Sequence, residues 1–366
     1  MRGRGLDLDC KKNIKLSIII PVYNTQQYLE KCLDSVVKAV YGIESQVEVL
    51  IINDGSTDDS VRIITQYCSQ NSYMKSFNKQ NGGLSDVKNY GLKHAVGEYV
   101  VFLDSDDYIE ADMYRVMLQK ISEENADVAV CDIRLTYDDP KKNQVYSCAV
   151  AAREGTFAQI IDMAMMPASW NKIIKKSLYS GLTFPVGLNN EDVSVTPIVL
   201  ARANKIVVVP EAYYNYYQRP GSIQNAHFDE RRFVILKTTG LCLERLGEIE
   251  QSKQEKIKGS LYMHQILAIA LYPIRTEKFK TRYVLLKKYM EKANNMFPDL
   301  WTNSEVAESL TWEGHYMQIF RKCSYFLLRH RYYFLTGIFW SVTNIIRKIT
   351  ERLHQRRAVT TVSEDK

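Results

Sequence analysis

Two carboxylates, Asp104 and Asp106, directly follow an apolar stretch over residues 99–103, whose β-branched and aromatic side chains predict a strand buried on both faces. In an extended segment residues i and i+2 point the same way, so the two carboxylates can project together. They are hard oxygen ligands, suited to a Mg²⁺ or Mn²⁺ ion that also holds phosphates. The alternative is an Asx-turn or a helix cap that merely starts a helix over residues 108–123.

Three further polar segments are expected at the same edge of the sheet. They are residues 21–24 (PVYN), 53–56 (NDGS) and 81–85 (NGGLS). The first two directly follow predicted strands, and the carboxyl ends of parallel strands share the rim where open α/β sheets bind ligands. That rim would offer the ring of Tyr23, the carboxylate of Asp54 as an acceptor for an imide N–H, and a glycine turn for close backbone approach. A nucleoside diphosphate needs all of these groups.

The first part of the chain alternates apolar runs with segments of helical spacing. Strands are predicted over residues 15–21, 47–52, 99–103 and 127–132. Helices are predicted over residues 28–40, from Ser56 as N-cap to Cys68, and over 84–95 and 108–123. This alternation predicts an α/β fold with a mostly parallel, Rossmann-like sheet flanked by helices.

After Asp132 the pattern changes. A short helix near residues 169–176, a helical stretch over 191–203 and strands over 205–210 and 213–217 are predicted. From residue 229 onward helices dominate, over residues 229–250, 254–272, 276–296 and 304–357, with breaks at Pro273 and Pro298. A helical C-terminal region therefore follows the sheet.

In this order the segments resemble the signature blocks of the family 2 glycosyltransferases, which are inverting enzymes with the GT-A fold. The resemblance covers roughly residues 16–223 and begins with LSIIIPVYN, IINDGSTDDS, NGGLSDVKNYGL and GEYVVFLDSDD, the last of which would hold a DXD motif. Later, ASWNKI (168–173) resembles the family's AWNKL segment, NED (190–192) its ED motif, and QRPGSI (218–223) its RPGSI turn. One departure is Lys88, where the family usually carries Arg.

The resemblance implies a nucleotide-sugar site. Asp54 would bind the pyrimidine ring, in a pocket formed with Tyr23 and neighbouring backbone. Asp104 would hold the ribose or the metal shell, and Asp106 would coordinate the divalent ion, Mn²⁺ or Mg²⁺. The full expected donor-binding set is Pro21, Tyr23, Asn24, Asp54, Lys88, Asp104, Ser105, Arg219 and Ser222. Asp54 could instead only stabilise a β-turn. Lys88 lacks the bidentate fork of an arginine and could lie on a solvated helix face.

An inverting transfer needs a general base across the sugar from the departing nucleotide. Asp192 of the matched ED motif is the expected base, ahead of Glu191. Alternatively both acids simply occupy the first turn of a helix, where the helix dipole favours negative charge. The two interpretations are compatible, because a helix N-terminus also keeps a carboxylate ionised. Trp170 is expected to form a wall of the acceptor pocket, although a core position suits an aromatic ring equally well.

The expected metal would neutralise charge that develops on the leaving diphosphate. Arg219 and Ser222 could close over the same phosphates as a mobile lid, or form no more than a Pro-Gly turn. His227 could complete the metal shell beside Asp104 and Asp106, although a lone histidine in a loop is more often solvated.

The composition, with 46% hydrophobic and 25% charged residues, is that of a globular protein, and the length allows one large and one smaller domain. We expect an extension over 1–13, a catalytic domain over 14–228 (nucleotide-sugar half 14–132, acceptor half 133–228) and a helical region over 229–366. Seven scattered cysteines without CxxC spacing indicate reduced thiols in a cytosolic protein. The first thirteen residues lack the apolar core of a signal peptide.

The net charge of +6 is concentrated near the end of the chain. Residues 321–357 hold nine Lys/Arg and one acidic residue, a local charge of +8, which leaves about −2 elsewhere and argues against a nucleic-acid binder. The longest uncharged run there, 332–346, has fifteen residues, whereas spanning a bilayer takes about 20. A basic amphipathic helix is therefore expected to lie on an anionic membrane surface. The alternative is packing on the catalytic domain or on a partner subunit, which could be a second copy.

The resemblance and these patterns together predict a metal-dependent, inverting glycosyltransferase. It would move a sugar from a nucleotide donor, UDP-linked, to a glycan or lipid-linked acceptor in bacterial capsule, exopolysaccharide or cell-wall synthesis, at the inner face of the cytoplasmic membrane. A non-catalytic nucleotide-sugar-binding scaffold is the second hypothesis. A sugar-nucleotide pyrophosphorylase is disfavoured, because residues 21–24 are not the glycine-rich, basic loop that such enzymes carry after their first strand.

Overall fold

The computed structural model describes residues 14–147, 167–219, 230–304, 306 and 315–345, without the side chains of residues 315–321. The predicted extension over 1–13, the site residues Ser222 and His227, and the end of the basic segment 321–357 lie outside the described residues. The chain divides into two compact units, residues 1–226 with 241–254, and residues 227–240 with 255–366. The domain boundary placed at residue 228 by the sequence stays a prediction.

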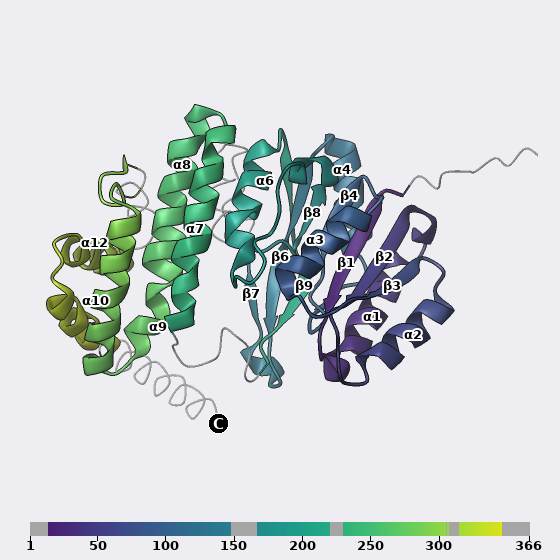
Figure 1. Ribbon diagram of the computed structural model, residues 1–366, viewed down its shortest axis with the longest axis horizontal. Helices are drawn as coiled ribbons and strands as arrows, with labels where there is room; N and C mark the ends of the chain where they lie inside the picture. The colour runs from purple at the N-terminus through teal and green to yellow at the C-terminus, as the bar shows by residue number, and fades with distance from the viewer. Residues whose placement is uncertain (1–13, 148–166, 220–229, 305, 307–314, 346–366) are drawn as a thin grey trace, which may run out of the picture. The chain divides into compact units, whose positions relative to one another are not determined.

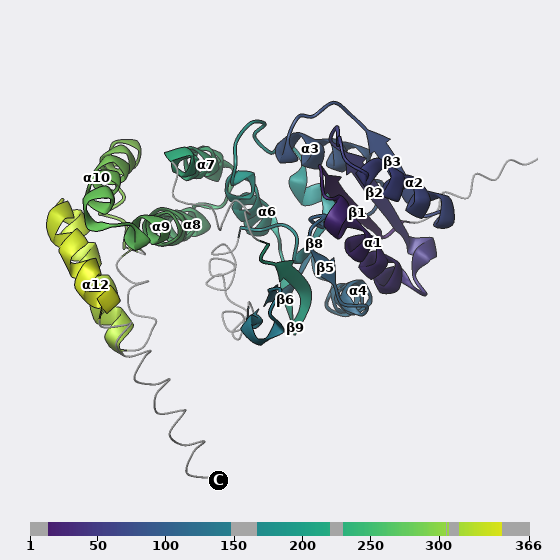
Figure 2. The same ribbon diagram turned by 90° about the horizontal axis from the view of Figure 1, so that it is seen from below.

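The first unit is built on four parallel strands in the order β3-β2-β1-β4. They are β1 (Leu16–Val22), β2 (Val47–Asn53), β3 (Met74–Asn78) and β4 (Tyr99–Phe102). Every residue of β1, β2 and β4 is buried, so helices must cover both faces of this sheet. Figures 1 and 2 show α3 (Leu84–His94) on one face and α1 (Gln26–Val40) on the other.

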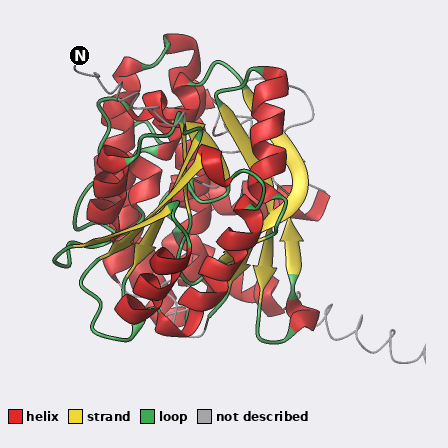
Figure 3. Cartoon of the chain, turned by 90° about the vertical axis from the view of Figure 1, so that its right-hand side faces the viewer, coloured by secondary structure: helices red, strands yellow, loops and turns green. Residues whose placement is uncertain are grey.

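The sheet continues beyond β4 with strands of mixed direction (Figure 3). The strand β8 (Lys172–Lys175) lies antiparallel between β4 and β6 (Val128–Thr136), and β9 (Ile206–Tyr217) runs parallel to β6. Two short strands, β5 (Tyr108–Ile109) and β7 (Gln144–Tyr146), pair antiparallel with β9 and β6. The predicted α/β class with a mostly parallel first half flanked by helices is confirmed.

Several predicted elements differ in the structure. The helix expected near 169–176 is instead the strand β8, because a short apolar run fits either element and pairing between β4 and β6 decides it. The helix expected over 108–123 is preceded by β5 and becomes α4 (Met113–Glu124). The strand β3 escaped prediction, since its residues alternate irregularly and are mostly exposed. The two strands expected at 205–210 and 213–217 form the single strand β9, with irregular register opposite Asp132.

The helix predicted to start at Ser56 begins later. The observed helix α2 (Ser60–Gln70) has Asp59 as its N-cap residue. The hydroxyl of Ser56 instead accepts a hydrogen bond from the backbone N–H of Asn24 (3.1 Å). Residues 54–57 are thereby left as a loop at the rim of the sheet.

The later part of the chain is helical, as predicted, through α7 (Val234–Arg245), α8 (Gln251–Leu261), α9 (Leu271–Thr276), α10 (Phe279–Met296) and α12 (His315–Arg329), followed by helical residues 333–345. The break at Pro298 is confirmed because α10 ends just before it. The predicted break at Pro273 is wrong, because Pro273 lies inside α9, which follows a π-helical stretch (Tyr262–Ile269). The single helix predicted over 304–357 is interrupted at Arg331, whose φ is +60°. Within the described part of the chain, no helix combines the length and apolarity that crossing a bilayer requires.

Candidate active site

The carboxylate of Asp54, in the loop after β2, holds the glycine turn that leads into α3. It accepts hydrogen bonds from the backbone N–H groups of Gly82 (2.9 Å) and Gly83 (2.8 Å) and from Lys79 Nζ (2.5 Å). Gly83 has a φ of +84°, a conformation that favours glycine. Asp54 therefore does stabilise a turn. An ionised carboxylate has about four acceptor positions, so beside these three donors it keeps capacity for another.

The loops after β1 and β2 are tied together by Asn24. Its side-chain oxygen accepts from the backbone N–H of Thr57 (2.8 Å), and its own N–H donates to Ser56 Oγ. Pro21 is buried within β1, whereas the side chain of Tyr23 is half exposed at the rim. Of these residues, Tyr23 is the one whose ring is open to a ligand.

The acidic segment after β4 is a turn. The backbone N–H of Asp107 donates to the carbonyl of Asp104 (3.0 Å), so residues 104–107 are not extended. Alternation along a strand is thus the wrong reason for Asp104 and Asp106 to lie together; the turn brings them close. The turn is anchored by the buried Asp107, which accepts from Tyr214 Oη (2.6 Å) and from the backbone N–H of Tyr217 (2.8 Å), both on β9.

The carboxylates of this turn lie close enough to repel one another. Burial raises the pKa of Asp104 to about 7; the nearby Lys88 opposes this rise and Asp106 adds to it. Burial, with the charges of Asp104 and Asp106, also raises the pKa of Asp107 well above its ordinary value. A cation beside the turn would relieve this repulsion, and carboxylate oxygens suit a divalent cation. The donor set therefore fits Mn²⁺ or Mg²⁺.

Asp106 already has a cationic neighbour. Its carboxylate pairs with Arg219 Nε (2.9 Å), and the Arg219 guanidinium lies over the ring of Tyr28 (5.8 Å to the centroid). Within the described residues, no three His, Cys, Asp or Glu side chains form a metal-binding group. The proposed third ligand, His227, lies outside those residues, as does Ser222, so the predicted lid is represented here by Arg219 alone.

Lys88, on α3, is almost completely buried and joins the two acids of the expected ED motif. Its Nζ donates to Glu191 Oε1 (2.8 Å), to Asp192 Oδ1 (2.7 Å) and to Ser169 Oγ (3.3 Å). Burial lowers the pKa of Lys88, but the charges of Asp192 and Glu191 outweigh it and hold this pKa above its ordinary value. The alternative of a solvated helix face is wrong for this lysine.

The two acids differ in access. Both lie in a 3₁₀ turn (Glu191–Ser194) that precedes α6 (Thr196–Arg202). The side chain of Glu191 is 8% exposed and that of Asp192 is 15% exposed. Burial raises the pKa of Glu191, although Lys88 opposes this. Asp192 also accepts from Ser169 Oγ (3.2 Å), which fixes the orientation of its carboxylate.

Trp170 is buried and stacks on Tyr214, with ring centroids 4.3 Å apart. Because Tyr214 is also the donor to Asp107, the tryptophan supports the acidic turn from the side of β9. Trp170, Tyr214, Asp107 and Lys79 were not connected by the sequence analysis. The adjacent Asp106-Asp107 pair was the single local signal that a third carboxylate takes part.

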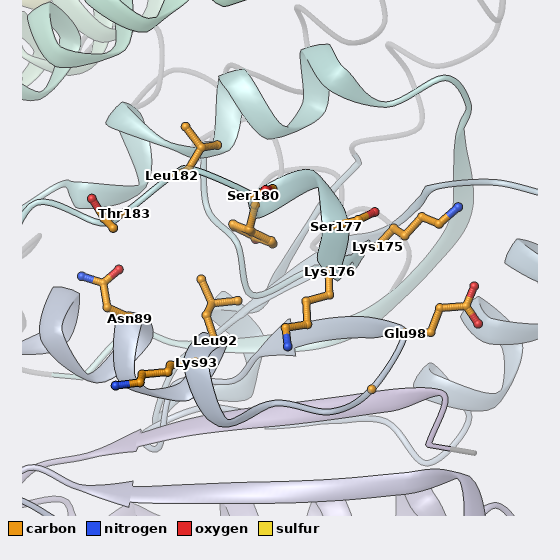
Figure 4. Close-up of a pocket in the computed structure, with 12 residues that line it drawn as sticks. Asn89, Leu92, Lys93, Glu98, Lys175, Lys176, Ser177, Ser180, Leu182 and Thr183 are labelled. Carbon is orange, nitrogen blue, oxygen red and sulfur yellow. The ribbon is translucent and has the colours of Figure 1, made fainter. Parts of the chain in front are cut away.

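A cavity of about 710 Å³ lies elsewhere, between α3 and residues 175–183 (Figure 4). It is lined in part by Gly97 and Glu98, which precede β4, whereas Asp104 follows that strand. The cavity is therefore at the amino end of β4. None of the predicted site residues lines it, and ligands of open α/β sheets bind at the carboxyl ends of the strands, so we assign the active site to the rim.

The sequence and fold of this chain match those of known proteins. Residues 17–189 match the family model "Glycosyl transferase family 2". The matched segment, just under half of the chain, is a family 2 glycosyltransferase domain. The chain is 31% identical over 252 residues to the glycosyltransferase GlyA of Streptococcus pneumoniae; the match covers 63% of this chain and 36% of GlyA, so the chain spans about a third of that relative.

Two further matches extend into the helical region. The cholesterol galactosyltransferase of Borreliella burgdorferi is 27% identical over 326 residues, which are 82% of this chain and 87% of that protein. The crystal structure of S. aureus TarS residues 1–349 in complex with UDP-GlcNAc matches with a TM-score of 0.67 and 20% sequence identity, covering 90% of this chain and 92% of that one. At this identity the likeness shows the fold, and the predicted GT-A fold is confirmed.

Proposed function

We propose that this family 2 glycosyltransferase transfers one sugar from a UDP-linked donor to an acceptor hydroxyl, with inversion at the anomeric carbon. One observation carries the proposal. Lys88 joins the candidate base Asp192 to the donor rim, since it pairs directly with Asp192 and acts electrostatically on Asp104. A candidate base and a candidate leaving-group site thus belong to one connected cluster, as an in-line displacement requires.

The donor would bind across the loops after β1, β2 and β3. Tyr23 presents an exposed ring for the base or sugar, and Asp54 retains acceptor capacity for an imide N–H. The glycine turn held by Asp54 lets the backbone approach closely, because Gly82 and Gly83 carry no side chain. The solved complex of TarS with UDP-GlcNAc, a protein of the same fold, supports a UDP-linked donor.

Asp104 and Asp106, with His227 as a further ligand, would hold Mn²⁺ or Mg²⁺. When bound, the ion would supply Lewis-acid stabilisation of the negative charge on the departing diphosphate. Arg219 would donate to the same diphosphate once it exchanges its pairing with Asp106. Ser222 would donate to that diphosphate as well. Ser105 ties the acidic turn to the start of α1, because its Oγ accepts a hydrogen bond from Thr25 Oγ1 (3.0 Å).

Asp192 would accept the proton of the acceptor hydroxyl as that oxygen attacks the anomeric carbon. Lys88 donates a hydrogen bond to the Asp192 carboxylate and so holds it in a single orientation. We therefore assign Lys88 a positioning role at the base, in place of the direct nucleotide contact expected from the family resemblance. Glu191, the more buried of the two acids, accepts a second hydrogen bond from Lys88 Nζ. Trp170 would reach the acceptor pocket only with its exposed edge, since it is 8% exposed.

The acceptor would be a glycan or a lipid-linked sugar in bacterial capsule, exopolysaccharide or cell-wall synthesis. A relative that matches across most of this chain is named for galactosylating cholesterol, which is a membrane lipid. Together with the basic segment 321–357, this supports a cytoplasmic enzyme bound peripherally to anionic lipid at the inner face of the cytoplasmic membrane.

The test is release of UDP from a panel of UDP-sugars, with and without Mn²⁺. Turnover should require the metal, and Asp106→Ala should abolish it. Asp192→Asn should abolish transfer while calorimetry still detects donor binding; loss of that binding would make Asp192 structural. Donor binding by the wild type without any turnover, across donors and acceptors, would instead indicate a nucleotide-sugar-binding scaffold.

A further inference from the structure

The helical residues 333–345 pack with their apolar side outward. The inward positions are Tyr333, Thr336, Trp340 and Thr343, all buried. The exposed residues of this stretch are all apolar, with Phe334 52%, Leu335 49%, Ile338 41%, Val342 49% and Ile345 58% exposed, and the polar Ser341 and Asn344 are partly exposed. A surface helix normally turns such a stripe toward the core, so this orientation needs a specific cause.

Hydrogen bonds on the inner side fix the orientation. Arg282, buried on α10, donates to the carbonyl of Gly337 (3.0 Å) and to Ser341 Oγ (2.7 Å). Trp340 Nε1 donates to Ser324 Oγ on α12 (3.0 Å). Rotating the helix to bury the apolar stripe would remove these acceptors from a buried guanidinium and a buried indole, which is unfavourable. The stripe is therefore held at the surface.

The stripe continues onto α10. The ring of Phe334 packs edge-to-face against Phe279 (5.4 Å between centroids), which is 36% exposed. We call the set Phe279, Phe334, Leu335, Ile338, Val342 and Ile345 the apolar face. Monomeric soluble proteins rarely expose contiguous apolar patches of this kind unless they mark an interaction site.

The charge around the apolar face selects its occupant. Lys278 and Lys280, both exposed, flank Phe279 in the sequence, and the exposed Arg329 and Arg331 precede the 333–345 helix. A second copy of the chain would bring the same +8 segment against its counterpart, and like charges disfavour that contact. An anionic lipid surface attracts these cations and accepts the apolar side chains into its acyl boundary.

We propose that the apolar face inserts into the surface of an anionic bilayer and anchors the enzyme there. This inference rests on the proposed membrane attachment and assigns it to particular side chains. It differs from the sequence prediction, because the contact is made by one face of the 333–345 helix together with Phe279 of α10, 55 residues or more earlier in the chain.

The experiment measures binding of the full chain to sedimenting vesicles, with phosphatidylcholine alone or mixed with phosphatidylglycerol. The test variant is Ile338→Gln with Val342→Gln, which changes two exposed positions and leaves the inner hydrogen bonds intact. Each CH₂ withdrawn from the lipid lowers a partition coefficient roughly fourfold, so the double variant should bind anionic vesicles at least about tenfold more weakly. The matched control is Val96→Gln with Val186→Gln, two exposed valines of the other unit.

The outcomes separate the possibilities. Strong binding of the wild type and the control to anionic vesicles, with weak binding of the test variant, supports the proposal. A wild type that ignores anionic vesicles, or a test variant that binds equally well, overturns it. So does a lipid-free dimer in sedimentation velocity that the test variant abolishes, since a second copy would then cover the face. UDP release without acceptor should be the same in all variants; its absence throughout refutes the proposed function, not the anchor.

Discussion

Replacing Lys88 with methionine keeps the length of a buried side chain but removes its charge from two carboxylates. The Nζ atom lies 2.8 Å from Glu191 and 2.7 Å from Asp192, and the lysine side chain is 2% exposed. Removing one partner of a buried ion pair costs about 3–5 kcal/mol. Because the Asp192 side chain is partly solvated, we expect the lower end, about 3 kcal/mol, in the free energy of unfolding measured with urea at pH 7.

The pH dependence of this loss follows from the pKa of Lys88, which is raised in the folded protein. The ion pair therefore stabilises the fold fully below the ordinary lysine pKa of about 10.4 and loses this contribution as the pH rises through the folded-state pKa. The stability difference between wild type and Lys88→Met should be complete at pH 7 and should begin to narrow only above about pH 10.

Catalysis should change in a way that stability alone does not explain. Lys88 opposes the rise in the pKa of Asp104, which is about 7 with the lysine present, and the rise in the pKa of Glu191. Without Lys88 both values increase. Fewer carboxylates are then ionised at pH 7, so kcat should fall by about 100-fold or more and the acidic limb of the kcat–pH profile should move to higher pH.

Lys88→Arg, which keeps the charge, should recover much of the activity and restore the position of the acidic limb. Lys93→Met is the matched control, since Lys93 is an exposed lysine of the same helix, and it should change neither property. The reasoning is refuted if Lys88→Met keeps its kcat and its pH profile. It is also refuted if the entire loss appears as a higher KM for the donor, because Lys88 would then be a nucleotide contact and not a positioning residue.

Three further variants test other parts of the site and fold. Tyr214→Phe removes the hydroxyl donor to buried Asp107; it should destabilise the protein by about 1–3 kcal/mol and weaken Mn²⁺-dependent donor binding in calorimetry, and an unchanged affinity would contradict an anchored acidic turn. Asp54→Asn loses the charge that accepts from Lys79, Gly82 and Gly83; donor KM should rise at least about tenfold with a smaller change in kcat. For Asp127, burial is outweighed by the Asn204 N–H and Lys175, so its pKa is lowered. Its stabilisation is present above the ordinary pKa of about 3.9 and lost as the pH falls through the folded value. Asp127→Asn should thus be about 1 kcal/mol less stable at pH 7 in urea unfolding, and the difference from wild type should narrow as the pH falls below about 4.

The buried strands β1, β2 and β4 and the helices α1 and α3 were predictable, because each is encoded by a local pattern of apolar residues. The loops that follow the strands were predictable too, since parallel strands must end at one rim. The family followed from the order of these segments. Elements without a local signal were missed or misassigned. The strand β8 exists because β4 and β6 are available to pair with it, and β3 is an exposed edge whose partner β2 supplies the reason for its conformation.

The sequence by itself determined the residue types at the rim, including Tyr23, Asp54, Asp104 and Asp106, because short motifs carry their own chemistry. Tertiary structure alone decided which of them act together. Lys88 reaches Asp192 across 104 residues of chain, and Asp107 reaches Tyr217 across 110. Tertiary structure also turned the apolar face outward, through hydrogen bonds from a buried arginine on another helix. Such contacts depend on how separate segments pack, and packing is not encoded in any one segment.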